Sequence, residues 1–561
     1  MAWTLGPLQQ AFDEASRRLE EAEVARSIWR GDESLWSDVP EAAGEIRQRL
    51  GWLRLPETAP GDLGDFQRLL RRAHKEDFTQ CILLGMGGSS LAPDVLRRTL
   101  ASSSGLQFHV LDSTDPSSVA RLGQASAEGK SLFIVSSKSG TTAEPLALLD
   151  FFWYQQEQIV GGPPGGRFVA ITDPDTPLAR QALERGFRGV FSGRPDVGGR
   201  FSALSAFGLL PAALMGIDTG GLLAGGRRMA RLCRKRRLRN NPGLALGAAL
   251  GAAGMQGRDK ITLLADSPWQ ALGDWIEQLI AESSGKDGKG LFPVVGEPLR
   301  SPQSYGDDRL FIYLRTRGDH DASTRTLATA GMPLVVLDLD PTPVGLGESF
   351  FCWEFAVAVA CHLLGVNAFD QPHVQGAKQR TNEALDALAR KGVLPELPSV
   401  WQAEGTRLAV PPGFSANLSG LDLPHVLRRL AAEARAGDAL VLLAYMDPQA
   451  AQAGALEELR TALSFAPWPA VTLGYGPRYL HSTGQLHKGG PNNLVVMMIT
   501  ADPSPDLAIP GQSLTFGQLE RAQALGDLQA LWSAGRRAFG LQVKDPSRLI
   551  GLAHAFTELP G

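Results

Sequence analysis

The sequence predicts an α/β protein with two doubly wound parallel-sheet domains followed by a third, C-terminal α/β unit. From about residue 80 onward, short apolar runs alternate with amphipathic stretches, which is typical of a parallel sheet covered by helices. At 561 residues the chain is also too long for one ordinary core. These two observations favour several packed units over a single large one.

The first two predicted segments are a helical lead-in and a first domain. Residues 8–30 and 41–50 have helical apolar spacing, and Pro56, Pro60 and Gly61 follow them, so 1–75 is predicted as a helical lead-in. Residues 76–220 are predicted as the first domain. Its expected strands are CILLGM (81–86), LQFHVLDS (106–113), SLFIVSS (131–137) and RFVAITD (167–173).

The same alternation predicts the other two units. Residues 221–398 form the expected second domain, with an apolar helix from about Ser349 to Leu364, and residues 399–561 form the C-terminal unit with a helix near 450–465. The expected strands are ITLLAD (261–266), LFIYLRT (310–316) and PLVVLDLD (333–340) in the second domain, then ALVLLAY (439–445) and NLVVMMIT (493–500) in the third unit.

Composition limits the classes of binding partner and the cellular compartment that we expect for this protein. The formal net charge of −4 gives no bulk attraction to nucleic acid or anionic lipid, and the basic segment 227–240 is interpreted as a charged surface helix. No stretch approaches the ~20 apolar residues of a membrane span, and the four cysteines are scattered. We expect a cytoplasmic protein with buried free thiols and with neither nucleic-acid nor membrane partners.

Two glycine- and hydroxyl-rich turns follow predicted strands. SSKSGTTAEP (136–145) leaves a strand and enters a helix, so its hydroxyl and backbone N–H groups suit an anion such as a phosphate, although Ser and Thr also cap helices. GMGGSSLAP (85–93) repeats the design. Its glycine spacing is GxGG, which makes a nucleotide site improbable, and one small phosphorylated ligand held between both turns fits better.

Two charged residues stand out downstream. Arg200 follows paired glycines, where a cation would stabilise an enediolate oxygen, and a salt-bridging surface residue is the alternative. Gln278 and Glu282 are four residues apart on one face of a helix expected to end at Gly285. A carboxylate there suits a general base, and the pattern alone leaves a solvated surface acid open.

Together these segments resemble the glucose-6-phosphate isomerase (phosphoglucose isomerase) family. The matching motifs are GMGGSSLAP, SSKSGTTAE, VGGRFSALSAFGLLP (197–211), QLIAESSGKDGKG (278–290) and FDQPHVQGAK (369–378), in the family's order. The resemblance implies two sugar-isomerase (SIS) domains with the active site in the cleft between them. It also implies isomerisation of glucose 6-phosphate and fructose 6-phosphate through an enediol(ate), without metal or other cofactor.

The resemblance assigns roles residue by residue. It implies Glu282 as the proton-transferring base, Arg200 as the group that stabilises the intermediate, and Lys378 in ring opening. The substrate-binding residues that it implies are Gly88, Ser89, Ser137, Lys138, Ser139, Thr141, Thr142, Gln278 and Gln371.

One expected group is missing from its usual place. Family members carry a histidine about twenty residues after the glutamate, but residues 291–310 contain none. His373, His481 and His487 are the available replacements, and His373 is also explained by packing or capping. We expect the third unit to bring His481 or His487 to the cleft in the same chain, where other members use the second subunit of a dimer.

Several alternatives stay open at the level of sequence. The segment 474–493 and residues 24–56 resemble the isomerase part of a bifunctional transaldolase/phosphoglucose isomerase subclass, so a native fusion to a transaldolase is possible. The chain could be a monomer or a homodimer. A dual phosphoglucose/phosphomannose isomerase and a non-catalytic sugar-phosphate-binding regulator are the rival functions, and Glu282 and Lys378 argue against the regulator.

Overall fold

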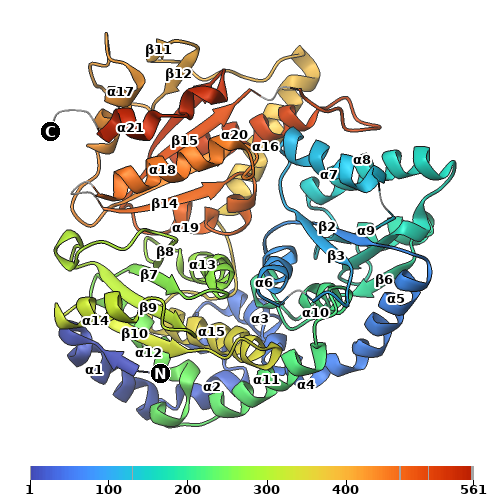
Figure 1. Cartoon of the computed structure of the whole chain (residues 1–561). Helices are drawn as coiled ribbons and strands as arrows, with labels where there is room; N and C mark the ends of the chain where they lie inside the picture. The colour runs from blue at the N-terminus through green and yellow to red at the C-terminus, as the bar shows by residue number, and fades with distance from the viewer. Residues whose placement is uncertain (1, 101, 129, 466–468, 503–504, 558–561) are drawn as a thin grey trace.

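A computed structural model of the chain describes residues 2–100, 102–128, 130–465, 469–502 and 505–557, and the described part contains three mostly parallel sheets flanked by helices (Figure 1). Each sheet and its helices form one unit, and we number the three units in chain order as the first, second and third unit. The α/β fold class predicted from the sequence is confirmed.

The first unit is an all-parallel sheet with strand order β3-β2-β4-β5-β6. Strands β2 and β4 are buried along their whole length because helices cover both faces, which explains their continuous apolar runs. The strands are β2 (Gln80–Gly85), β3 (Gln107–Leu111), β4 (Ser131–Ser136), β5 (Phe168–Thr172) and β6 (Gly189–Ser192). The helices are α6 (Leu91–Leu100), α7 (Pro116–Glu128), α8 (Ala143–Val160), α9 (Pro177–Glu184) and α10 (Ala206–Leu214).

The second unit repeats this plan with strand order β1-β10-β9-β7-β8. Its edge strand β1 (Ala2–Thr4) runs antiparallel to β10 and belongs to the segment 1–75, which the sequence predicts as a helical lead-in. The other strands are β7 (Lys260–Ala265), β8 (Phe292–Val295), β9 (Arg309–Arg315) and β10 (Leu334–Asp338). The helices are α11 (Thr219–Cys233), α12 (Pro242–Met255), α13 (Gln270–Ser284), α14 (Asp321–Thr329), α15 (Pro343–Leu364) and α16 (Val374–Lys391).

Helix α15 is the long apolar helix of the second unit. Within the described residues it alone is long and apolar enough to cross a membrane, and 89% of its most apolar 18-residue window is buried inside the protein. It packs along α11 and α12 as a core helix (Figure 1).

The N-terminal helices wrap around the outside of the first two units. Trp36 donates from its indole nitrogen to the carbonyl of Ala358 in α15, at 2.8 Å. The basic segment 227–240 faces these helices, and its arginines form ion pairs with Glu20, Glu23 and Glu57. The helices are α1 (Gln9–Glu21), α2 (Val24–Arg30), α3 (Pro40–Arg47), α4 (Leu55–Thr58) and α5 (Leu63–Lys75).

The third unit has strand order β11-β12-β16-β15-β13-β14, with four parallel strands and an antiparallel pair, β11 and β12, at one edge. Its strands are β11 (Trp401–Ala403), β12 (Thr406–Ala409), β13 (Ala439–Tyr445), β14 (Ala470–Tyr475), β15 (Leu494–Ala501) and β16 (Arg537–Val543). Its helices are α17 (Leu423–Ala431), α18 (Ala451–Phe465), α19 (Gly484–Gly489), α20 (Phe516–Ser533) and α21 (Leu552–Thr557).

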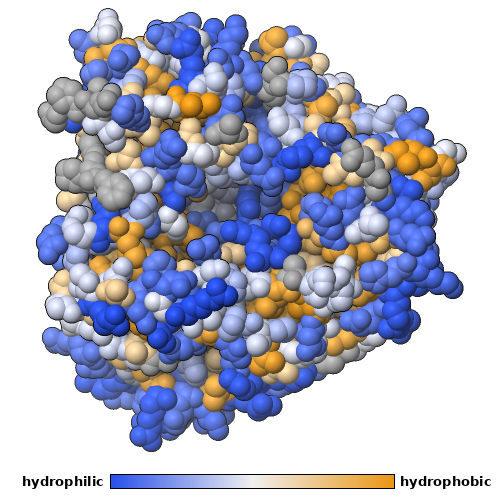
Figure 2. All heavy atoms as spheres, viewed as in Figure 1, coloured by the Kyte–Doolittle hydropathy of each residue, from blue (hydrophilic) through white to orange (hydrophobic). Residues whose placement is uncertain are grey.

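The third unit is packed against both of the others. Leu486 and Tyr445 share one apolar cluster with Ala281 and Phe292 of the second unit. Ile509, Phe516 and Leu519 join the core of the first unit. Where the three units meet, the molecular surface is hollowed and hydrophilic side chains gather (Figures 1 and 2).

Candidate active site

Glu282 lies in the last turn of α13, and both of its carboxylate oxygens are held. Its Oε1 is 3.0 Å from Nη1 of Arg200, and its Oε2 accepts a hydrogen bond from Nε2 of Gln278 at 3.1 Å. Glu282 and Gln278 face the same way because they are one helical turn apart. Glu282 is only 9% exposed, so the sequence alternative of a solvated surface acid is wrong.

Arg200 is buried and held by three further contacts. Its Nε donates to Oγ of Ser283 at 2.8 Å, and its Nη2 donates to the carbonyls of Ala368 and Asp370 at 2.7 and 3.0 Å. Only Nη1 faces Glu282. The guanidinium therefore cannot rotate freely, which is the kind of preorganised cation that stabilises developing negative charge.

The first glycine turn approaches this pair through its backbone. A Cβ atom on Gly88 would lie 2.3 Å from the carbonyl oxygen of Gly199, next to Arg200. Gly87 adopts φ of +54°, and a Cβ there would lie 2.6 Å from the carbonyl oxygen of His481. Both positions need glycine because no side chain fits.

His481 reaches the same place from the third unit, in the turn between β14 and α19. Its backbone carbonyl accepts a hydrogen bond at 2.7 Å from Nε2 of Gln278, the same nitrogen that bonds Glu282. Its ring Nε2 lies 2.9 Å from Oε1 of Glu144, in the first turn of α8. His481 therefore connects the helix that carries Glu282 with α8, the helix that follows the hydroxyl-rich turn at 137–142.

Glu144 and His481 form a partly buried ion pair. Burial lowers the pKa of His481, but the charge and hydrogen bond of Glu144, with a further contribution from Glu282, outweigh it and raise the pKa above its ordinary value. Burial raises the pKa of Glu144, but the charge of His481 outweighs it, so the pKa is lowered. Gln523 of α20 also donates to Glu144 Oε1, at 2.7 Å.

The hydroxyl-rich turn at 137–142 precedes α8. Ser137 Oγ donates to Thr142 Oγ1 at 3.0 Å, and the hydroxyls of Ser139 and Thr141 lie 3.0 Å apart. Ser139 and Thr141 are exposed at the start of the helix, where backbone N–H groups lack intrahelical acceptors. Thr142 occupies the N-cap position of α8, and its side chain makes no capping hydrogen bond.

The chain is similar in sequence to known glucose-6-phosphate isomerases. The family model described as phosphoglucose isomerase matches residues 71–290, which include both turns, Arg200 and Glu282. A glucose-6-phosphate isomerase of Carboxydothermus hydrogenoformans is 30% identical over 397 residues, covering 60% of this chain and 85% of that protein. A glucose-6-phosphate isomerase of a Synechococcus strain is 31% identical, covering 65% of this chain and 80% of that protein.

The chain belongs to the phosphoglucose isomerase family. It is therefore an isomerase, and the non-catalytic regulator is set aside. Among solved structures, a hypothetical protein of Thermus thermophilus is 26% identical with a TM-score of 0.58, covering 68% of this chain and all of that one. A glucose-6-phosphate isomerase of Chlamydia trachomatis shares the fold at 20% identity and a TM-score of 0.51, covering 65% of this chain and 78% of that one.

Other residues assigned from the phosphoglucose isomerase motifs lie around this centre. Ser89 is buried in the first glycine turn. The ammonium group of Lys138 contacts Asp173 and the carbonyl of Arg194, outside the turn at 137–142. Burial lowers the pKa of Lys138.

The segment 369–378 begins beside Arg200 and enters α16. Gln371 and Lys378 are exposed, and the charge of Lys378 acts on His481. His373 occupies the N-cap position of α16, where its backbone N–H donates to Oε1 of Gln485 at 3.0 Å and its ring Nδ1 lies 2.9 Å from Nε2 of the same glutamine. The structure thus ties His373 to α19.

The structure does not bring His487 into this group. It is 2% exposed in α19, and burial together with Lys488 and Arg536 lowers its pKa to about 3. Its Nδ1 has no hydrogen-bond partner among the described residues. The imidazole is therefore neutral and packed beside the ring of Tyr479.

Arg478, three residues before His481, anchors the turn that carries the histidine. Its guanidinium lies 3.3 Å from Asp112 and 3.7 Å from Asp94 in the first unit, and 3.9 Å from Asp274 in α13. Next to it, Tyr479 donates to Asp527 of α20 at 2.7 Å. The position of His481 is thus fixed by contacts with all three units.

Sequence reasoning missed several of these supporting residues. Glu144 lies inside the quoted motif SSKSGTTAE, but an acid in a first helical turn is already explained by the helix dipole. Gln523 lies in a segment with no motif, and Arg478 lies in the segment 474–493, whose resemblance assigned it no role. Only the folded chain brings both residues to this site. Among the described residues, no group of three or more His, Cys, Asp or Glu side chains is arranged to hold a metal ion.

Proposed function

We propose that this chain interconverts glucose 6-phosphate and fructose 6-phosphate through an enediol(ate) intermediate. Support comes from the family membership and from the names of the relatives, which are glucose-6-phosphate isomerases. The observation that carries the proposal is the placement of Glu282 between Arg200 and Gln278, directly beside the third unit's His481.

Glu282 is the proposed base. An aldose–ketose exchange needs one group that removes the proton from C2 and returns it to C1, and a single carboxylate within reach of both carbons does this without a cofactor. Gln278 fixes one oxygen of Glu282 by a neutral hydrogen bond, and the other oxygen faces Arg200. The carboxylate is therefore held in one orientation, which supports efficient transfer.

Arg200 is the proposed partner of the intermediate. When the proton moves to Glu282, the carboxylate loses its charge and the enediolate oxygen gains it. The Nη1 group of Arg200 then has a new anionic partner within the same cleft, and its other contacts to Ser283, Ala368 and Asp370 keep it in place.

His481 and Lys378 are the proposed ring-opening groups. Opening the cyclic sugar requires a proton at the ring oxygen and removal of one from the C1 hydroxyl. The ion pair of His481 with Glu144 supports a donor role because it raises the pKa of the imidazole and so favours its protonated form. The phosphate is assigned to the hydroxyls and N–H groups of the turn at 137–142, which lies just before Glu144.

A coupled assay with fructose 6-phosphate tests the proposal. The Glu282→Gln variant is expected to lose about 10²- to 10⁴-fold in kcat because the amide keeps the shape but cannot accept a proton. Glu277→Gln on the same helix is the matched control. Burial raises the pKa of Glu277 to about 8, so its side chain is already largely neutral near pH 7.

Mannose 6-phosphate serves as the second substrate in the same assay. Turnover of both sugars would establish a dual phosphoglucose/phosphomannose isomerase, which needs a base that serves both C2 epimers. Wild-type inactivity on both would refute the proposed reaction, and full activity of Glu282→Gln would reject Glu282 as the base.

A further inference from the structure

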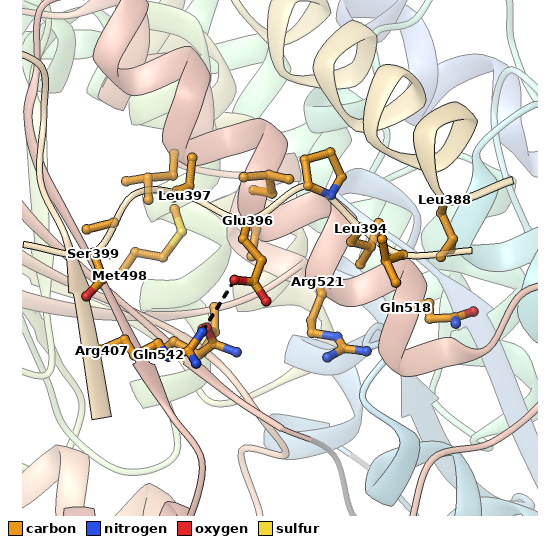
Figure 3. Close-up of a pocket in the computed structure, with 18 of the residues that line it drawn as sticks. Leu388, Leu394, Glu396, Leu397, Ser399, Arg407, Met498, Gln518, Arg521 and Gln542 are labelled. Carbon is orange, nitrogen blue, oxygen red and sulfur yellow. Dashed lines mark hydrogen bonds and ion pairs between the residues drawn. The ribbon is translucent and has the colours of Figure 1, made fainter. Parts of the chain in front are cut away.

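A cavity of about 350 Å³ lies in the third unit, apart from the site just described (Figure 3). It is enclosed by one face of β12, β16 and β15, by α20, and by the segment 392–399 that follows α16. Its volume is within the range of small-molecule sites. The proposed isomerase reaction uses none of the residues that line it.

The sheet face of the cavity consists of two adjacent cross-strand rows. Ala409, Gly540 and Met498 are register partners and form a small, apolar row. The next row along the sheet contains Arg407, Gln542 and Thr500, which are again register partners. Each lies two residues from its neighbour in the first row, on β12, β16 and β15 respectively. Because side chains two residues apart share a face, the cavity has an apolar part next to a polar end.

Helix α20 forms the opposite wall and continues this division. Leu525 and Leu528 line the apolar part, and Gln518 and Arg521 lie one to two turns earlier on the same helical face. Leu394 and Leu397 close the apolar part from the side of the 392–399 segment (Figure 3).

The polar end carries two arginines whose present partners are weak. Arg407 is 3.4 Å from Glu396, whose side chain is 82% exposed, and Arg521 is 3.5 Å from Asp502, with both side chains about 40% exposed. Exposed ion pairs contribute little free energy, so an anion that binds the arginines more tightly can replace these carboxylates. The Nε of Arg521 is buried and has no hydrogen-bond partner among the described residues, so it can still accommodate an acceptor.

We infer that this cavity is a binding site for a small amphipathic anion, a molecule with one carboxylate, sulfonate or phosphate group and a compact apolar body. The anionic group lies between Arg407 and Arg521, with Gln518 and Gln542 as further donors. The apolar body lies along Met498, Leu525 and Leu528. Arginine suits this role because its planar fork matches the oxygens of such groups.

The site is coupled to the cleft through two helices. On another face of α20, Gln523 donates to Glu144, and a Cβ on Gly526 would lie 3.0 Å from the carbonyl oxygen of Ala377, next to Lys378. Ala377 and Lys378 belong to α16, and Leu388 in the last turn of that helix lines the cavity. An occupant that shifts α20 or α16 therefore changes the surroundings of Glu144 and Lys378, and this second step rests on the proposed function.

Binding is tested with 8-anilinonaphthalene-1-sulfonate, a fluorescent amphipathic anion. We expect saturable one-site binding to the wild type, at least tenfold weaker binding to the double variant Arg407→Gln/Arg521→Gln, and binding within twofold of wild type for Arg429→Gln, an exposed arginine of α17 in the same unit. Circular dichroism confirms that the variants are folded. Equal affinity of the double variant would overturn the site.

Two further measurements define the ligand and the coupling. Displacement of the dye by octanoate or by phenyl phosphate identifies the preferred anionic group, and displacement by neither contradicts the proposed class. The dye is also expected to change kcat or KM for fructose 6-phosphate at least twofold in the wild type and not in the double variant. Unchanged kinetics with intact binding would overturn only the coupling, whereas an inactive wild type would refute the proposed function and leave the site standing.

Discussion

Replacing Arg478 by Met is expected to destabilise the protein and to displace His481. At an effective dielectric constant of about 20, the guanidinium attracts a carboxylate at 3.3 Å, the distance to Asp112, by about 5 kcal/mol. The pairs with Asp94 and Asp274, at 3.7 and 3.9 Å, are slightly weaker. Asp94 and Asp112 are largely buried, whereas the side chains of Arg478 and Asp274 are 28% and 35% exposed. Desolvation offsets most of the attraction, and breaking a fully buried pair costs about 3–5 kcal/mol net, which is the upper range for this partly exposed cluster.

The pH dependence of this loss has a definite sign. Burial already raises the pKa values of Asp112 and Asp274, and Arg478 counteracts that effect. Without the arginine these pKa values rise further in the folded state, so the folded protein holds protons that the unfolded chain releases, and stability falls as pH rises. The loss in Arg478→Met is therefore expected to be larger at pH 8 than at pH 5.

Urea unfolding at pH 5 and pH 8, followed by tryptophan fluorescence, measures this difference. Arg429→Met, which removes an exposed arginine from the same unit, is the matched control and is expected to change the free energy of unfolding by less than about 0.5 kcal/mol. A loss in Arg478→Met below about 1 kcal/mol at both pH values would refute the electrostatic argument. Unchanged kcat would show that the arginine does not position His481.

Three further predictions use other variants, two on the site and one on stability. His481→Ala is expected to lower kcat on the cyclic sugar by about 10²-fold, whereas His487→Ala should have little effect on it, and the reverse order in the coupled assay would reject the assignment. Glu144→Gln removes the charge that raises the pKa of His481, so the limb of the pH profile of kcat/KM that reports the histidine should move to lower pH; an unmoved limb would mean that another group titrates there. Burial and Arg200 lower the pKa of Lys286 to about 8, so the free energy of unfolding should rise between about pH 8 and pH 10 as the folded protein releases this proton first. In urea titrations, the Lys286→Met variant should lack that rise in the free energy of unfolding. If the rise persists in the variant, groups other than Lys286 cause it.

Much of the fold could be predicted because most central strands are buried on both faces. Strands such as β2, β4 and β13 appear in the sequence as continuous apolar runs, and their positions match the predictions within a residue or two. Strands β6 and β8 have four residues each, and β1 has three, too few for an apolar run to be recognised. Their pairing depends on neighbours that are distant in sequence.

The candidate site divides in a similar way. Glu282, Arg200 and the two turns lie within local motifs, where glycine and hydroxyl spacing restricts the conformation. The contribution of the third unit is different, because the environment of His481 is set by Glu144, 337 residues away, and by Gln278, 203 residues away. Composition near 481 predicts a polar loop, but it cannot choose between His481 and His487.

These separations in sequence have a consequence for how the molecule is made. A ribosome completes the turn at 137–142, Arg200 and Glu282 long before it reaches His481, and Gln523, which donates a hydrogen bond to Glu144, emerges later still. Domains generally fold in the order of their synthesis. The first two units can thus assemble around an unfinished site, which is completed only after the third unit has been translated.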